Sequence, residues 1–451
     1  MSKTQKFDLT EGKILGKLLM VALPIMAMQF FQMMYTLVDM FLLGRISAYA
    51  VAASGSAGMF LWLSFAFILI GSMGAEIGVS QSLGKGDPET AKKYSQNATF
   101  IALTLGTIYG IILILFSPFL MSFFRIQEAH VVADGIAYLS ILGLCIPFNF
   151  MSFSFQGTFN GSGNSRYPFI IKASGFVLNI LLSILFIFYF GWGIRGAAAA
   201  TVVAQLYIFI VFAIIIRYHK IRPFKDYRYR DIFKPDLTII KQIFKWAIPV
   251  TIESMCFTLL TMIISRMIAT FGAAAIAIVR VGTQIEALSW LIAGGFASAL
   301  TAFVGQNYGA KSYDRIRKGV RLSAGIMSVY GLIITFIIFF GARFLFSLFI
   351  HEEEIILLGI DYLRIFAFVQ LIACIESIAA GAFRGLGKTK PPSIVSVSCN
   401  VARVFFAYGL SQTALGLNGI WVGMAIGNFF RGGTLAIWYF LHSRRMADST
   451  R

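Results

Sequence analysis

The chain has 451 residues, of which 58% are hydrophobic and only 13% are charged, and its mean hydropathy is +0.79. No soluble domain of this length is so apolar, so the composition excludes a soluble enzyme and predicts an all-α polytopic membrane protein. The net charge of +18 does not indicate nucleic-acid binding, because the basic residues lie in short loops between apolar segments rather than in a domain of their own.

Twelve apolar segments are long enough to cross a bilayer, which takes about 20 residues of helix. We expect these segments at about 14–44, 50–82, 92–117, 133–160, 167–191, 195–217, 239–270, 274–306, 319–345, 356–385, 391–414 and 418–441. Prolines predict bends or helix starts at Pro24, Pro147, Pro249 and the pair Pro391 and Pro392.

The first segment carries a single carboxylate, Asp39. A charge at bilayer depth costs roughly 2.5 to 3.5 kcal/mol on insertion scales, so such a residue is a functional candidate. At about 100° per residue, Gln32, Tyr35 and Thr36 share the helix face of Asp39, which predicts one polar side. The alternative is an interfacial aspartate that pairs with Arg45, but further apolar residues separate the two.

Basic residues are concentrated in the two tails and in the even-numbered loops. These stretches are 1–17, 84–93, 161–172, 217–245, 309–321, 384–390 and 443–451, whereas the odd-numbered loops carry only Arg45, Arg125, Arg195 and Arg343. By the positive-inside rule, we expect both termini to be cytoplasmic.

The two halves of the chain repeat each other at a nearly constant offset of about 225 residues. Residues that recur in the same order include Pro24 as Pro249, Thr36 as Thr261, Tyr138 as Tyr362, Gly157 as Gly381, Gly161 as Gly385 and Gly163 as Gly387. The polar chemistry differs at two positions, since Asp39 corresponds to Ile264 and Asn179 to Arg403.

Six spans in each repeat make the two halves parallel, which is the arrangement of transporters that move two bundles around a central site. We therefore predict twelve transmembrane helices in two parallel six-helix lobes around a central cavity. The N-terminal lobe is expected over 1–216, a cytoplasmic linker over 217–235 and the C-terminal lobe over 236–451.

Several motifs follow one another along nearly the whole chain. They are ALPIMAMQFFQMMYTLVDMFLLGR, VSQSLGKGDPETAKK with its echo VGQNYGAKSYDRIRKG, GTFNGSGNSRYP with its echo GAFRGLGKTKPP, and VGTQIEALSW. In these motifs the chain resembles the bacterial type of the multidrug and toxic compound extrusion (MATE) family of the MOP flippase superfamily. The resemblance implies a monomeric secondary active exporter in the cell (inner or plasma) membrane. Such a protein moves small organic, often cationic and amphiphilic, compounds out of the cytoplasm against inward H⁺ or Na⁺ by alternating access.

By the same resemblance, Asp39 matches the ion-coupling aspartate of the first helix, and Gln32, Asn179 and Thr201 match polar residues near it. Where the family often has a second aspartate, this chain has Ser183. The alternative role for Asn179 and Thr201 is interhelical hydrogen bonding. The residues that we expect to line the substrate cavity are Tyr35, Met33, Met40, Thr36, Ser183 and Gln205.

Asp39 also suits ion coupling on physical grounds. A carboxylate in a low-dielectric cavity can bind and release a proton, and when ionised it attracts Na⁺ or a cationic substrate. Competition between ion and substrate for one such group is a sufficient coupling mechanism.

The second half holds acids and bases in roughly balanced numbers, which indicates paired charges, because an isolated charge in a bilayer is costly. We predict a stabilising polar network here. The alternative is that Glu253 or Glu376 forms a second ion site. The candidate members of the network are Glu253, Arg280, Gln284, Glu286, Glu376 and Arg403.

Enzymatic functions are not favoured. The four histidines lie in loops or at span ends, and no P-loop motif is present, so neither a catalytic cluster nor an ATP-driven pump is expected. The four cysteines lack metal-ligand spacing. We expect no cofactor, no metal site and no nucleic-acid partner, with H⁺ or Na⁺ left open as the coupling ion. The alternative function is a flippase for a lipid-linked saccharide or another lipid, which would be expected to have a strongly cationic cavity.

Overall fold

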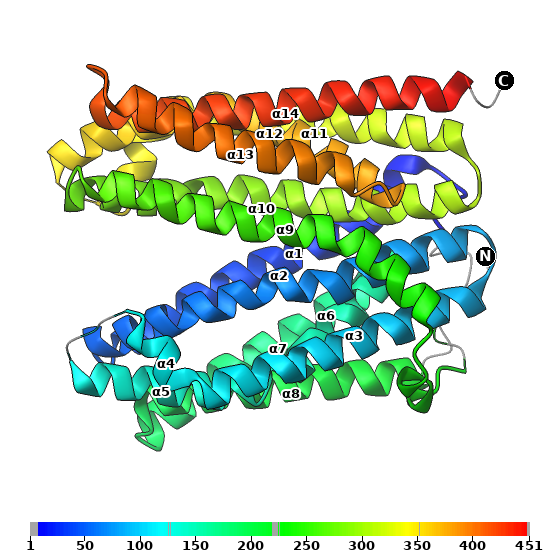
Figure 1. Ribbon diagram of the computed structural model, residues 1–451, viewed down its shortest axis with the longest axis horizontal. Coiled ribbons are helices and arrows are strands. Elements are labelled where there is room, and N and C mark those ends of the chain that lie inside the picture. The colour runs from blue at the N-terminus through cyan, green and yellow to red at the C-terminus, as the bar shows by residue number, and fades with distance from the viewer. Residues whose placement is uncertain are drawn as a thin grey trace. The chain divides into compact units, whose positions relative to one another are not determined.

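The computed structural model describes residues 8–124, 126, 128–218, 224, 226–350 and 352–448, and all regular structure within them is helical (Figure 1). Arg125 and residues 219–223 and 225 of the predicted linker lie outside the described residues. This agrees with the predicted all-α class, because in a bilayer a helix satisfies every backbone polar group within its own segment.

The first half of the chain forms eight α-helices in the described residues. They are α1 (Ile14–Gly44), α2 (Ala48–Gly84), α3 (Pro88–Leu115), α4 (Ser117–Ser122), α5 (Ala129–Gly143), α6 (Ile146–Gly161), α7 (Arg166–Ile184) and α8 (Gly193–Tyr218). A short π-helix, η2 (Leu185–Tyr189), continues α7, and a 3₁₀ turn, η3 (Tyr229–Phe233), precedes the second half.

The second half forms six long helices. They are α9 (Leu237–Ala269), α10 (Ala273–Gly309), α11 (Tyr313–Ser347), α12 (Glu353–Gly385), α13 (Lys390–Ser411) and α14 (Gly416–Asp448). Within the described residues, ten helices of the chain are long and apolar enough to cross a membrane. The bent pair α5 and α6 would add an eleventh span, and α14 is the remaining long helix.

Three of the predicted prolines stand at helix starts, and two lie inside helices. Pro147 is the second residue of α6, where the chain bends by 51° relative to α5. Pro391 and Pro392 stand in the first turn of α13. Their missing backbone N–H groups cost no hydrogen bond, because the N–H groups of a first turn have no partner within the helix. Pro24 and Pro249 lie inside α1 and α9, where each removes a helical hydrogen bond.

The chain forms two compact units whose boundaries fall beside these two internal prolines. The first unit contains Leu23–Thr251, and the second contains Thr10–Ala22 and Ile252–Arg451. The beginning of α9 therefore belongs to the first unit, where Ile243 and Trp246 join small apolar clusters with residues of α2.

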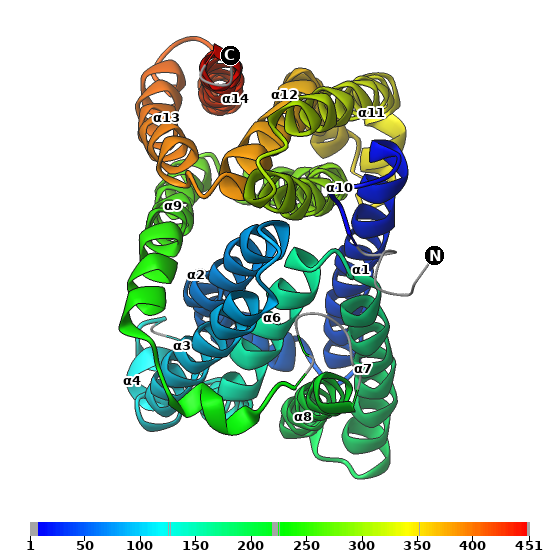
Figure 2. The same ribbon diagram turned by 90° about the vertical axis from the view of Figure 1, so that its right-hand side faces the viewer.

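The same helix packing recurs inside each unit. In the first unit α2, α3 and α6 pack against one another, and α7 packs on α8. In the second unit their sequence equivalents do the same, with α12 packed on α10 and α11, and α13 packed on α14 (Figure 2). The repeat in the sequence thus corresponds to a repeat in packing.

Repeated glycines bring the central helices of each unit into backbone contact. A Cβ on Gly157 of α6 would lie 2.1 Å from the carbonyl oxygen of Ser72 in α2. A Cβ on Gly381 of α12 would lie 2.5 Å from the carbonyl oxygen of Ala297 in α10. Small residues allow such close approach of membrane helices.

The turns that follow these two helices also repeat. Gly163 has φ of 81° and Gly387 has φ of 72°, which is the left-handed region that glycine adopts without strain. The amides of Asn164 and Lys388 donate to the carbonyls of Phe159 and Phe383, which closes both helix ends in the same way. The glycines of the GTFNGSGNSRYP motif are therefore turn and packing residues.

We predict that Gly157→Ala and Gly381→Ala each destabilise the protein by about 1 to 3 kcal/mol, because a methyl group cannot fit against a backbone oxygen. The measurement is the apparent Tm of detergent-solubilised protein. Gly325→Ala in α11 is the matched control, since a Cβ there meets no atom within 4 Å. An equal Tm for all three variants would contradict the close backbone contact.

Candidate functional site

Asp39 lies in the C-terminal half of α1 and is partly buried. Its Oδ1 is buried and has no hydrogen-bond partner among the described residues. The Asp39 carboxylate is also an electrostatic neighbour of the hydroxyl groups of Tyr35 and Tyr138. A buried carboxylate oxygen without a partner is costly, so it is available to a proton, an ion or a ligand.

A cluster of hydroxyl and amide groups lies one helical turn from Asp39. The Thr201 hydroxyl donates to the carbonyl of Ala197, which leaves its lone pairs to accept from Tyr35 Oη at 3.3 Å and from Asn179 Nδ2 at 3.2 Å. Ser183 Oγ donates to Asn179 Oδ1 at 3.3 Å. The structure thus brings together Tyr35, Asn179, Ser183 and Thr201 from α1, α7 and α8.

This cluster is held in place by apolar packing. The ring of Tyr35 stacks on Phe176 of α7, with centroids 5.2 Å apart and planes 16° apart. Asn179 and Ser183 are 3% and 0% exposed. Tyr138 and Phe176 were not among the residues predicted from the sequence, because their position depends on how α5 and α7 pack around α1.

The other candidates on α1 and α8 lie outside the hydrogen-bonded cluster. Thr36 is exposed and its hydroxyl donates to the Gln32 carbonyl of its own helix at 3.1 Å. Met40 is 53% exposed, whereas Met33 is partly buried. Gln205 is partly buried one turn from Thr201 on α8.

Lys172 is a buried lysine that falls both in the basic stretch 161–172 and in the expected span 167–191. It lies inside α7 and is 5% exposed. Its Nζ lies 3.4 Å from the centroid of the Phe153 ring, a cation–π contact. Because Lys172 and Asn179 are seven residues apart, they share one face of α7.

In the second unit, Glu286 of α10 is 5% exposed and accepts two hydrogen bonds from α12. Tyr362 Oη donates to Oε1 at 2.7 Å, and Gln370 Nε2 donates to Oε2 at 3.4 Å. The Tyr362 ring stacks on Phe366 and meets Trp421 edge-on. Glu286 is therefore positioned by neutral donors.

Other members of the predicted network are paired differently. Glu376 forms an ion pair with Arg431, with 2.8 Å between Oε1 and Nε. Glu253 accepts from Ser393 Oγ at 2.9 Å. The acids Glu253 and Glu376, with Arg384, line a cavity of about 130 Å³ in the second unit.

Arg403 is 4% exposed and does not join an ion pair in the described residues. Its Nη2 donates to Thr261 Oγ1 at 3.2 Å, and its guanidinium lies over the Phe257 ring at 5.3 Å. Arg280 and Gln284 are exposed. They lie roughly 120° and 160° around α10 from Glu286, so they lie on other faces of the helix.

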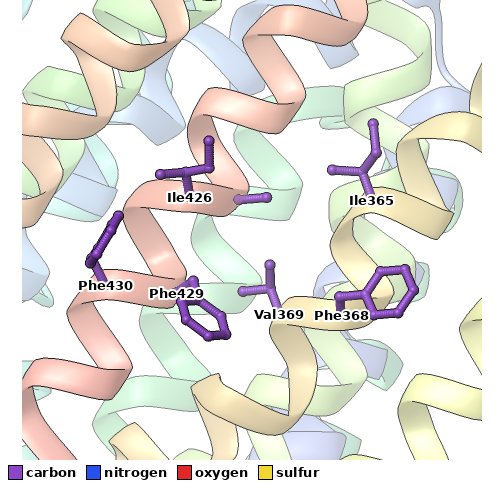
Figure 3. A pocket seen from close by; sticks show the side chains of 7 residues that line it. Ile365, Phe368, Val369, Ile426, Phe429 and Phe430 are labelled. Atoms are coloured by element: carbon purple, nitrogen blue, oxygen red, sulfur yellow. The ribbon is translucent and has the colours of Figure 1, made fainter.

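A second cavity, of about 230 Å³, lies between α12 and α14 (Figure 3). Its lining is entirely apolar and consists of Ile365, Phe368, Val369, Ala425, Ile426, Phe429 and Phe430. It offers no group that could bind an ion. In the described residues, no group of three or more His, Cys, Asp or Glu side chains is placed to hold a metal ion.

Comparisons with known proteins agree with this architecture. The MatE family model matches residues 24–185 and again residues 249–409, so it covers most of the chain and recognises both halves. A curated relative from Thermotoga maritima, "Probable multidrug resistance protein NorM", is 28% identical over 439 residues, covering 96% of this chain and 93% of the relative.

Solved structures share the fold over the whole chain. The "Crystal structure of MATE in complex with MaD3S" superposes with a TM-score of 0.92 at 21% identity, covering 99% of this chain and 100% of that one. The "Outward-facing conformation of a multidrug resistance MATE family transporter of the MOP superfamily" gives a TM-score of 0.90 at 22% identity and covers 99% of both chains. With the double match to the family model, these likenesses mean that the chain belongs to the MatE family.

Proposed function

We propose that this protein is a secondary active multidrug exporter. It moves small organic cations out of the cytoplasm by alternating access, against an inward flow of H⁺ or Na⁺. Two observations support drug transport as the function. The chain belongs to the MatE family, and its Thermotoga maritima relative is named as a probable multidrug resistance protein. The alternative, a flippase for a lipid-linked saccharide, has less support, since the relative is named for multidrug resistance.

The observation that carries the proposal is the partnerless oxygen of Asp39. A carboxylate oxygen buried without a hydrogen bond in the described residues is open to one cationic ligand at a time. A proton or Na⁺ that occupies Asp39 removes its attraction for an organic cation. Binding of the coupling ion therefore favours release of the substrate.

The neighbouring cluster has a supporting role in this proposal. Tyr35 is fixed by its hydrogen bond to Thr201 and by its stacking on Phe176, so it presents its ring and its free lone pairs beside Asp39. An aromatic ring next to a carboxylate suits flat or amphiphilic cations. Asn179 and Ser183 hold Thr201 in place from the other side.

The proposal includes the organisation predicted from the sequence. We infer two six-helix lobes, 1–216 and 236–451, joined by a cytoplasmic linker over 217–235, with both termini in the cytoplasm. The partners are organic cations and the lipid bilayer, and the protein acts as a monomer.

Asp39→Asn is expected to abolish ion-driven efflux. At 4 Å and an effective dielectric constant of 20, the attraction between a carboxylate and a monovalent cation is about 4 kcal/mol, which the amide does not supply. The measurement is the efflux of a cationic dye by proteoliposomes under an imposed H⁺ or Na⁺ gradient, and comparison of the two gradients identifies the coupling ion. Glu354→Gln, at an exposed acid in the first turn of α12, is the control and should transport normally.

Unchanged efflux by Asp39→Asn would remove Asp39 from the coupling mechanism. If the wild-type protein moved a fluorescent polyprenyl-linked sugar between leaflets and did not move the dye, the flippase function would replace the exporter.

Thr201→Val keeps the shape of the side chain but removes the hydroxyl that accepts from Tyr35 and Asn179. Hydrogen bonds between membrane helices average about 0.6 kcal/mol, so the loss of two should cost about 1 kcal/mol. Because the cluster fixes Tyr35 beside Asp39 in the substrate-bound state, a loss of about 1 kcal/mol in that state should raise the KM for the dye about fivefold. Thr258→Val is the matched control, because the Thr258 hydroxyl bonds only to a carbonyl of its own helix; an equal KM in both variants would argue against a role for the cluster in binding.

A further inference from the structure

A repeated tyrosine stands beside a carboxyl group in each unit. Tyr138 and Tyr362 are equivalent in the sequence repeat and are 7% and 1% exposed. Tyr138 is an electrostatic neighbour of Asp39, and Tyr362 donates a hydrogen bond of 2.7 Å to Glu286. The tyrosine kept its position in both halves, so the two acids occupy comparable surroundings.

The two acids come from different helices. Asp39 lies on α1, and its equivalent on α9 is the buried Ile264. Glu286 lies on α10, and its equivalent on α2 is Leu61, which packs against the apolar core of the first unit. Each unit therefore has one carboxyl beside its repeated tyrosine, although the acid was not inherited from a common position.

No cation offsets a charge on Glu286. In the described residues it makes no ion pair, and its hydrogen-bond donors are the neutral groups of Tyr362 and Gln370. Arg403 is an electrostatic neighbour of Tyr362, and its Nη2 donates to Thr261. Burying an unpaired carboxylate costs several kcal/mol. A purely structural residue would rarely carry such a cost, so a functional role for Glu286 is favoured.

The other side chains that the described residues place along this stretch of α10 are neutral. From α11, Tyr330 approaches Ser289, one turn along α10, and Cys374 of α12 is close to both. From α14, the Trp421 ring meets Tyr362 edge-on at 5.4 Å. None of these groups competes with Glu286 for a proton near neutral pH.

Gln370 can accommodate both charge states of the Glu286 carboxyl. The ionised form accepts from the Gln370 amide nitrogen at 3.4 Å. The Gln370 Oε1 atom is buried and has no hydrogen-bond partner among the described residues. Rotation of the amide by 180° would turn this oxygen toward Glu286 Oε2, where it could accept a bond from the protonated carboxyl while Tyr362 still donates to Oε1.

We propose that Glu286 is a proton-carrying carboxyl group, the second-unit counterpart of Asp39, with Gln370 as the amide that satisfies both of its charge states. The inference rests on the proposed ion-driven export and specifies a second proton site. In the described residues the Glu286 carboxylate hydrogen bonds only to Tyr362 and Gln370, which offer too few oxygen ligands for a hard metal ion, so the site suits a proton. Glu286 takes up one proton and releases it again in each cycle.

The direct test is pH-difference infrared spectroscopy of the purified full chain in lipid, read in the carbonyl-stretching region of protonated carboxyl groups. We expect a band that persists in Asp39→Asn and disappears in Asp39→Asn/Glu286→Gln. Glu376→Gln in the Asp39→Asn background is the matched control, because Glu376 is paired with Arg431, and it should keep the band. A band that is equally strong with and without Glu286 would overturn the proposal.

A second variant covers the case in which Glu286→Gln does not fold. Gln370→Leu removes the amide but leaves the carboxyl, so it should shift the frequency of the band without abolishing it, and an unshifted band would contradict the role of Gln370. The spectra need no transport, so they separate this proposal from the proposed function. If the wild-type protein exports no cations but the Glu286 band titrates, only the exporter function fails.

A transport measurement addresses the use of this proton. Where H⁺ drives efflux, we expect Glu286→Gln to lower the number of protons moved per exported cation by about one, and Asp39→Asn to abolish driven export. An unchanged proton count together with loss of the infrared band would show that Glu286 titrates without taking part in transport, and this would overturn its role as a carrier.

Discussion

The structure depends on one constraint, which is that a polar group inside a bilayer finds no water and has to be satisfied by the protein itself. Backbone groups meet this constraint by forming uninterrupted helices of 22 to 37 residues over most of the predicted spans, such as α13 and α2. Side chains meet it through local clusters such as that of Thr201, Tyr35 and Asn179. Among the buried side-chain atoms of the described residues that lack a hydrogen-bond partner, Asp39 Oδ1 is the one carboxylate oxygen, which leaves it open to a proton or a cation.

Duplication gave the two units the same scaffold but different polar chemistry. The glycine contacts of Gly157 with Ser72 and of Gly381 with Ala297 occur at equivalent positions, so the close packing of the central helices is common to both. The side chains that face these scaffolds have diverged, since Asn179 hydrogen bonds to Thr201 whereas its equivalent, Arg403, reaches Thr261. Helix packing tolerates such changes because it depends on small residues at the contacts rather than on the polar face.

The charges within each unit follow a related pattern. Some are neutralised in pairs, as Glu376 is by Arg431, and these pairs are expected to hold helices together. Others have no partner of opposite charge among the described residues, notably Lys172 on the Phe153 ring and Glu286 beside Tyr362. When an unpaired group gains or loses a proton or a bound cation, no neighbouring opposite charge offsets the change. The electrostatic energy of the unpaired groups therefore depends most strongly on protonation and on bound cations.

The sequence by itself determined the helical class, the positions of the spans and the repeat, because hydrophobic length and loop residues follow directly from the thickness of the bilayer. It also singled out Asp39, because a charge in an apolar segment stands out, whereas Asn179 and Thr201 came from the resemblance to the MATE family. It could not decide between loop and span for Lys172, because the basic stretch 161–172 and the expected span 167–191 overlap there. The sequence also did not show that Glu286 is buried while Arg280 and Gln284, on other faces of the same helix, are exposed. Only the tertiary structure decided which charges meet, because the contact of Tyr362 with Glu286 depends on how α12 packs on α10, and spacing along the chain carries no information about that packing.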